Sequence, residues 1–129
     1  MRLNPDCIRD ILLTIDTLAI PNTSGHVEEM RPEDIFTAMN SEKYTQNEVL
    51  YTISCLCEEG FLKKGKQFII DSSPRIADIT PKGYQFIDFT KSDDSWMCIK
   101  NLFQTAISKG LEVSATALYN VAINNVLNI

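Results

Sequence analysis

Hydrophobic residues recur at spacings of three and four along most of the chain, which is the period of amphipathic helices. This pattern predicts helices over residues 5–20, 32–39, 46–59, 81–89, 93–109 and 115–129. Asparagine, serine and threonine cap helix N-termini with a side-chain oxygen, and one of them precedes most of these helices: Asn4, Thr45, Thr80, Ser92 and Ser114. We therefore expect a mainly helical chain.

The predicted third helix carries the most complete set of signals. Thr45 and Glu48 match the capping box, in which a threonine hydroxyl and a glutamate side chain satisfy two unpaired N–H groups. Gly60 suits the left-handed residue that ends a helix, and Phe61 is placed to contact Leu56 across that end. The apolar stripe of this helix consists of Val49, Leu50, Ile53, Leu56 and Cys57.

A β-hairpin is predicted after the third helix. Residues 61–70 are rich in strand-forming side chains, residues 71–74 are typical of a turn, and residues 75–79 fit a second, short strand. The segment 27–30 is too short to assign and fits at most a brief edge strand.

The order of these elements predicts the fold class. Two helices joined by a short turn form a helix-turn-helix, and a hairpin that follows makes it a winged helix, with the last of those helices facing a DNA groove. We predict a mainly α protein with a small β-hairpin, a winged helix-turn-helix-like domain with additional C-terminal helices. Residues 1–129 would form a single domain, with a winged-helix core at 1–90 and a C-terminal helical extension at 91–129.

Three stretches of the chain carry a resemblance to a known family. They are residues 4–12 (NPDCIRDIL), residues 79–88 (ITPKGYQFID) and residues 93–96 (DDSW). All three are similar to motifs of the domain of unknown function 2513 family, a group of uncharacterised proteins from bacteria and their phages. Pro81 stands where that family's pattern leads us to expect an aromatic residue. The resemblance implies a winged-helix-like domain and brings no established activity.

The composition is that of an ordinary globular protein, with 44% hydrophobic and 22% charged residues. No apolar run approaches the ~20 residues that a bilayer span needs, and the first residues lack the continuous apolar core of a secretory signal. We therefore expect a cytoplasmic protein. The four cysteines have no metal-ligand spacing, so we interpret them as reduced thiols.

Candidate catalytic groups are sparse. His26 is the one histidine, and it lies in a polar loop. Asp93 and Asp94 stand at a helix start, where acidic side chains are favourable without any catalytic role. The five glycines are scattered and form no phosphate-binding loop. We predict that the protein is not an enzyme and uses neither a cofactor nor a metal ion.

Positive charge gathers on the predicted hairpin. The whole chain has a net charge of −5, which argues against strong general affinity for nucleic acid, but residues 60–82 carry five basic and two acidic side chains. Lys63, Lys64, Lys66 and Arg75 are therefore candidate contacts to a phosphate backbone. Lysines that protect an exposed sheet edge from pairing would give the same pattern.

The third helix supplies candidate base-reading residues. Gln46 and Asn47 lie in its first turn and suit adenine edges, and the polar Thr52 and Ser54 follow further along. All four would equally be solvent-facing polar residues. The helix carries no lysine or arginine, so we expect weak binding to double-stranded DNA by a monomer.

The last helix is uncharged over residues 113–129, and this admits two interpretations. It packs across the core of its own domain, or part of it forms a homodimer interface with a polar rim that includes Tyr119 and Asn120. The leading functional hypothesis is a non-enzymatic DNA-binding regulator of bacterial or prophage origin that acts as a dimer. The alternative is a winged-helix module that binds a basic protein partner and no DNA.

Overall fold

The computed structural model describes residues 1–66 and 75–127, and over these residues it contains six helices and one two-stranded antiparallel sheet. The elements are α1 (Pro5–Leu18), α2 (Pro32–Met39), α3 (Gln46–Glu58), β1 (Leu62–Lys64), β2 (Ile76–Ile79), α4 (Pro81–Thr90), α5 (Asp93–Ser108) and α6 (Ala115–Leu127). The predicted mainly α fold with a small β-hairpin is confirmed. Within the described part of the chain, no helix combines the length and the apolar character needed to cross a bilayer.

The helices begin where the capping residues predict. The side-chain oxygen of Asn4 accepts from the Asp6 N–H at 3.0 Å. Thr45 Oγ1 does the same for Glu48 N–H at 3.1 Å. Ser92 and Ser114 cap α5 and α6 in the same way. Each bond satisfies an N–H group that has no partner within its helix, so local sequence fixes these starts.

The end of α3 directs the chain into the hairpin. Gly60 has a φ of +84°, a conformation that costs glycine little and other residues more. Its N–H donates to Cys57 O at 3.3 Å, and the Phe61 N–H donates to Leu56 O at 2.9 Å. This pair of bonds is the Schellman motif, which confirms the predicted left-handed end of the helix. As a result, β1 starts two residues after Gly60.

The predicted hairpin is present, with shorter strands than expected. β1 and β2 pair antiparallel, with Leu62 opposite Ile79. The predicted strand residues 67–70 and the predicted turn 71–74 lie outside the described residues. The segment 27–30 contributes isolated bridges rather than a strand. Val27 pairs with Pro21, and Met30 exchanges two 2.8 Å hydrogen bonds with Ile76, on the side of β2 away from β1. β1 therefore forms an edge of the sheet.

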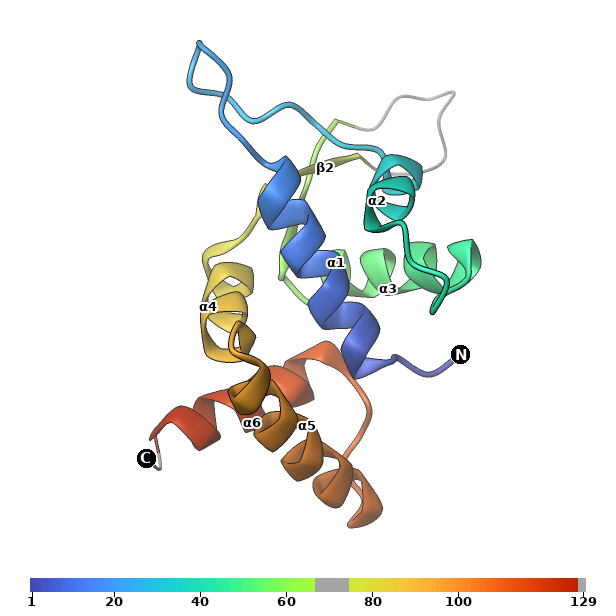
Figure 1. Cartoon of the computed structure of the whole chain (residues 1–129), viewed down its shortest axis with the longest axis vertical. Coiled ribbons are helices and arrows are strands. Elements are labelled where there is room, and N and C mark those ends of the chain that lie inside the picture. Colours follow the sequence, from blue (N-terminus) through green and yellow to red (C-terminus); the bar gives the residue numbers. More distant parts are fainter. Residues whose placement is uncertain (67–74, 128–129) are drawn as a thin grey trace.

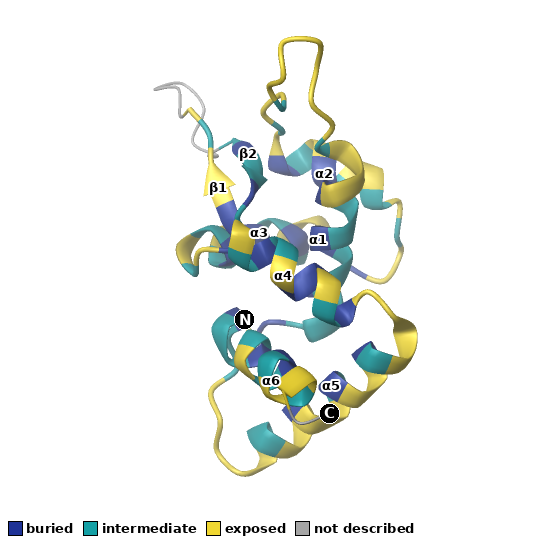
Figure 2. Cartoon of the chain, turned by 90° about the vertical axis from the view of Figure 1, so that its left-hand side faces the viewer, coloured by how far each residue is buried: buried dark blue, intermediate teal, exposed yellow. Residues whose placement is uncertain are grey.

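α1 is the central element of the molecule, with α2 and α3 to one side and α4 to the other (Figure 1). Five of its side chains are buried: Cys7, Ile8, Ile11, Leu12 and Ile15. Helices α5 and α6 gather at the end of the molecule opposite the hairpin, and buried residues from both join the same hydrophobic core (Figure 2). Their contributions include Trp96, Ile99, Phe103, Leu118 and Ala122.

Polar contacts fasten α5 to α1. The Asp6 carboxylate accepts a hydrogen bond from Trp96 Nε1 at 2.9 Å and pairs with Lys100 Nζ at 3.1 Å. Burial opposes the ionisation of Asp6, but these two donors outweigh it and hold the pKa of the carboxyl below its ordinary value. Asp6 is therefore ionised at neutral pH and links the start of α1 to the first turns of α5.

Arg9, one turn further along α1, binds the junction between α4 and α5. Its guanidinium donates to the carbonyl oxygens of Thr90 at 2.9 Å and Lys91 at 3.1 Å, and it pairs with Asp93 at 3.1 Å. A cation at this position satisfies carbonyl groups that the end of α4 leaves unpaired. One side chain thus fixes the bend between two helices.

Glu59 links the end of α3 to the start of α6. An acid at the C-terminal end of a helix interacts unfavourably with the dipole of that helix. The structure instead turns its carboxylate toward the start of α6, where it accepts from Ala115 N–H at 3.2 Å and Thr116 N–H at 3.0 Å. The Glu59 carboxylate thus interacts favourably with the dipole at the start of α6, and its hydrogen bonds connect the end of α3 to the C-terminal helices.

Candidate nucleic-acid interface

One face of α3 is open to solvent. The opposite face buries Val49, Thr52, Ile53 and Leu56 against the core. Gln46 and Asn47, the base-reading candidates, are both exposed in the first turn, directly after the Thr45 cap. The helix is therefore anchored along one side and presents its candidate residues on the other.

Thr52 is a correction to the sequence analysis. Its side chain is 1% exposed, and its hydroxyl donates to Glu48 O at 2.7 Å within the same helix. A threonine whose hydroxyl is satisfied by its own helix is free to pack in a core. Ser54, the other polar residue noted further along α3, is exposed.

Tyr51 is a residue of this face that sequence reasoning missed. Its side chain is 41% exposed, although tyrosine is usually more buried than this. Position 51 lies two residues from both Val49 and Ile53, on the side of the helix away from the apolar stripe. The spacing alone therefore contained the signal for an outward-facing aromatic side chain.

The hairpin candidates lie on and beside the edge strand. Lys63 and Lys64 belong to β1 and are exposed, and Lys66 is exposed just beyond it. The Lys66 N–H donates to Glu29 Oε1 at 2.8 Å, so an acidic residue from the α1–α2 connection lies close to this cluster. Arg75 is half-buried, and its carbonyl accepts from the Gly65 N–H. Three of the four basic candidates are thus available to a ligand through exposed side chains.

The structure does not bring the two sets of candidates together at one point. Gln46 and Asn47 begin α3, whereas the lysines follow its end, so the 13-residue helix separates them by about 20 Å. A site of this kind has to be an extended surface. Extended surfaces suit a long ligand such as a duplex better than a small molecule.

Charge along this surface is uneven. The part provided by α3 has no basic side chain and includes the exposed Glu58, whereas the hairpin part is basic. Edge strands often carry lysines that prevent pairing with another chain, and Lys63 and Lys64 lie on such an edge. The geometry is consistent with both roles for these two lysines.

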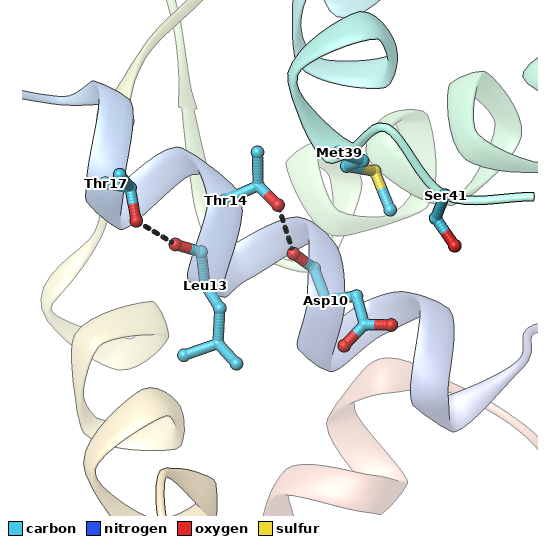
Figure 3. A pocket seen from close by; sticks show the side chains of 6 residues that line it. All are labelled: Asp10, Leu13, Thr14, Thr17, Met39 and Ser41. Carbon is cyan, nitrogen blue, oxygen red and sulfur yellow. Dashed lines mark hydrogen bonds between the residues drawn. The ribbon is translucent and has the colours of Figure 1, made fainter.

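Polar side chains also line a pocket between α1 and α2, away from the hairpin (Figure 3). The hydroxyls of Thr14 and Thr17 donate to carbonyls of their own helix, at 2.7 and 3.1 Å. The Asp10 carboxylate accepts from the Tyr44 hydroxyl at 2.7 Å, and burial together with this carboxylate raises the pKa of Tyr44. These groups stabilise the packing of α1 against the segment that follows α2. Over the described residues, no group of three His, Cys, Asp or Glu side chains is placed to hold a metal ion.

The sequence matches the model of a known family. The model of the family described as "Hypothetical protein (DUF2513)" matches residues 2–110. The chain belongs to this family. The match contains α1 to α5, while α6 follows it. No curated protein and no solved structure matches the chain.

The structure gives a physical reason for the motif at residues 79–88. Thr80 Oγ1 accepts from the Gly83 N–H at 3.2 Å and donates to Gly60 O at 2.6 Å, so it caps α4 and holds the end of α3. A Cβ atom at Gly83 would lie 2.4 Å from Phe61 O, which leaves room for glycine alone. Pro81, the departure from the family pattern, occupies the first turn of α4, where the missing N–H of proline costs nothing.

Proposed function

We propose that this protein is a non-enzymatic winged helix-turn-helix protein that contacts double-stranded DNA through α3 and the hairpin. The observation that carries the proposal is the continuity of the surface. The exposed face of α3 begins with Gln46 and Asn47 and leads, through the tight end at Gly60, directly into an edge strand with exposed lysines. The proposal includes a cytoplasmic location, because the proposed ligand is DNA.

The arrangement of elements supports this proposal. α2 and α3 are consecutive helices joined by the short segment 40–45, and the hairpin follows at once. In helix-turn-helix proteins, the second helix of the pair lies in the major groove with its N-terminal residues at the base edges. In the proposed complex α3 takes that place, and the lysines of β1 contact phosphate groups beside the groove.

The charge distribution limits the affinity that we expect. Lys63, Lys64, Lys66 and Arg75 are the basic residues of the hairpin, and α3 adds none. Each phosphate neutralised contributes about −0.9 to the slope of log affinity against log salt, so the three exposed lysines give an expected slope of about −3 per protein chain. Binding by one chain is therefore weak at physiological salt.

We also propose that a second copy of the chain packs on α6 and doubles these contacts. In a two-fold symmetric contact the same patch of each chain meets its copy, so a net charge on that patch would repel the second chain. α6 carries no charge although the chain has a net charge of −5, and Leu127 and Val126 are 75% and 36% exposed at its end. Tyr119, proposed as part of the polar rim, is partly buried: its ring packs against Phe61 and its hydroxyl donates to Gln85.

The DNA proposal is tested by titrating the full chain with a random-sequence duplex at low and moderate salt. We expect affinity that falls with salt, and weaker binding with a smaller slope in the Lys63→Glu/Lys64→Glu variant. The matched control is Lys91→Glu/Lys109→Glu, which makes the same change in net charge at two exposed positions away from the hairpin. Absence of binding at ~50 mM salt, or equal weakening by both variants, would refute the proposal.

The second candidate function is a protein-interaction module that binds a basic partner and no DNA. The observation that favours it is the lack of any cation on α3, together with Glu58 on its exposed face and Glu29 beside the hairpin. A folded chain that fails to bind duplex at low salt, yet binds a lysine-rich peptide in a salt-dependent way, is the result that this alternative predicts.

A further inference from the structure

The exposed face of α3 has a specific chemical composition. Burial of Val49, Ile53 and Leu56 fixes the rotation of the helix about its axis, so a second set of side chains faces outward. That set comprises Gln46, Asn47, Leu50, Tyr51 and Ser54, with Glu58 at the C-terminal end of the helix; Leu50 is partly exposed and the others are exposed. Positions three and four apart are neighbours on a helix, so these side chains form two adjoining rows on one face.

Base pairs differ in the groups that they present in the major groove. Guanine presents two acceptors, which arginine or lysine reads. Adenine presents an acceptor beside a donor, which the amide of asparagine or glutamine matches, and thymine adds a methyl group that apolar side chains contact. The outward face of α3 offers two amides, an aliphatic side chain and an aromatic ring, and it offers no cation for guanine.

From this match we propose that α3 reads A·T base pairs in the major groove, an inference that rests on the proposed DNA-binding function. The amides of Gln46 and Asn47 hydrogen-bond adenine, and Leu50 and Tyr51 contact the methyl groups of thymine. Both amides lie in the first turn, the part of a recognition helix that reaches base edges.

The same reasoning divides the work between two elements. The lysines of β1 contact phosphate groups, which are identical in every sequence, so they contribute affinity and salt dependence without discrimination. The amide, aliphatic and aromatic side chains of α3 are uncharged, so they contribute discrimination without salt dependence. Substitutions on the two elements should therefore produce different signatures in one binding experiment.

The experiment compares binding of the full chain to two duplexes with identical flanks and either an A·T-rich or a G·C-rich core, at one fixed salt concentration. We expect the A·T-rich core to bind about tenfold more tightly, the range that one or two amide–adenine pairs supply. The Gln46→Ala/Asn47→Ala variant should lose most of that ratio and keep the salt slope of the unmodified protein. Asn101→Ala removes an exposed amide from α5 and serves as the control that leaves the ratio unchanged.

Two base analogues separate major-groove reading from the narrow minor groove of A·T-rich DNA, which attracts cations by shape alone. Replacing adenine by 7-deazaadenine removes the major-groove acceptor, and replacing thymine by uracil removes the methyl group. We expect both replacements to reduce the A·T preference. A preference that survives both replacements, or binding with no preference at all, would overturn the inference while DNA binding stands, whereas no binding to either duplex would overturn both proposals.

Discussion

The close approach of α4 to the start of β1 yields a prediction whose sign depends on the structure. Gly83 lies in the first turn of α4. Helix propensity alone predicts that alanine at this position would increase the stability by up to about 1 kcal/mol. A Cβ atom at this position would lie 2.4 Å from Phe61 O and 2.5 Å from Ile79 Cγ2. We therefore predict that Gly83→Ala destabilises the protein.

The magnitude follows from what has to move. Phe61 O is a backbone atom, and it already accepts the Thr80 N–H at 3.1 Å, so it has little freedom to shift. Forcing an extra methyl group into a packed site costs about 1–3 kcal/mol, which exceeds the gain in helix propensity. The net loss should be about 1–2 kcal/mol, or a fall in Tm of roughly 4 °C for each kcal/mol in a chain of this size.

Equilibrium urea unfolding of both proteins measures this difference directly. Asp88→Ala is the control, because position 88 is exposed on the same helix and its free energy of unfolding should change by no more than about 0.5 kcal/mol. A Gly83→Ala protein as stable as the parent, or more stable, would show that α4 does not approach β1 this closely.

Three further predictions concern single side chains. Glu59→Gln should lower the free energy of unfolding by about 1 kcal/mol in urea, because the amide removes the negative charge from the start of α6; an unchanged value would contradict the capping role. The pKa of Asp6 is lower in the folded protein, so its contacts stabilise the fold above the ordinary carboxyl pKa of 3.8 and this stabilisation is lost as the pH falls through the folded value. Asp6→Asn should therefore lower Tm at neutral pH and bring the two melting curves together in acid, and a constant difference across the pH range would argue against the assignment. Cys98 is exposed, whereas burial raises the pKa of Cys7 to about 11. A thiol reagent should therefore modify Cys98 in the native protein and Cys7 only after unfolding, and equal rates of modification in the native protein would contradict this prediction.

Local signals in the sequence predicted the ends of the helices well. Asn4, Thr45 and Thr80 cap the helices that follow them, and Gly60 ends α3, because each bond involves atoms within a few residues. The pairing of the hairpin also followed from residues near one another in the chain. Such features depend little on the rest of the fold.

Features that depend on distant partners were not predictable from the sequence. Glu59 meets α6 across 56 residues, and Met30 pairs with Ile76 although the segment around it forms no strand. The buried position of Thr52 depends on a hydroxyl bond that a polar–apolar pattern does not encode. The contact of the Tyr119 ring with Phe61 likewise joins residues far apart in the chain. Apart from the Thr52 hydroxyl bond, which lies within α3, the deciding contacts are tertiary.

The candidate site was predictable as a set of residues and not as a surface. Gln46, Asn47, Lys63, Lys64 and Lys66 are exposed, as expected for polar and charged side chains. The spacing of Tyr51 relative to the apolar stripe contained the signal for its outward position, whereas the form of the whole surface required the three-dimensional arrangement. The extended form of the site is what favours a duplex as its ligand.

The contacts that Asp6 and Arg9 make with α5 have a practical consequence for shortening the chain. A protein ending at residue 90 would keep both charged side chains on α1 but lose Trp96, Lys100 and Asp93, and Phe86 would lose the ring of Trp96 that packs against it. Glu59 would likewise have no helix start to cap. A fragment truncated to the hairpin-containing half should therefore be poorly folded and prone to aggregation, so binding assays should use the intact chain.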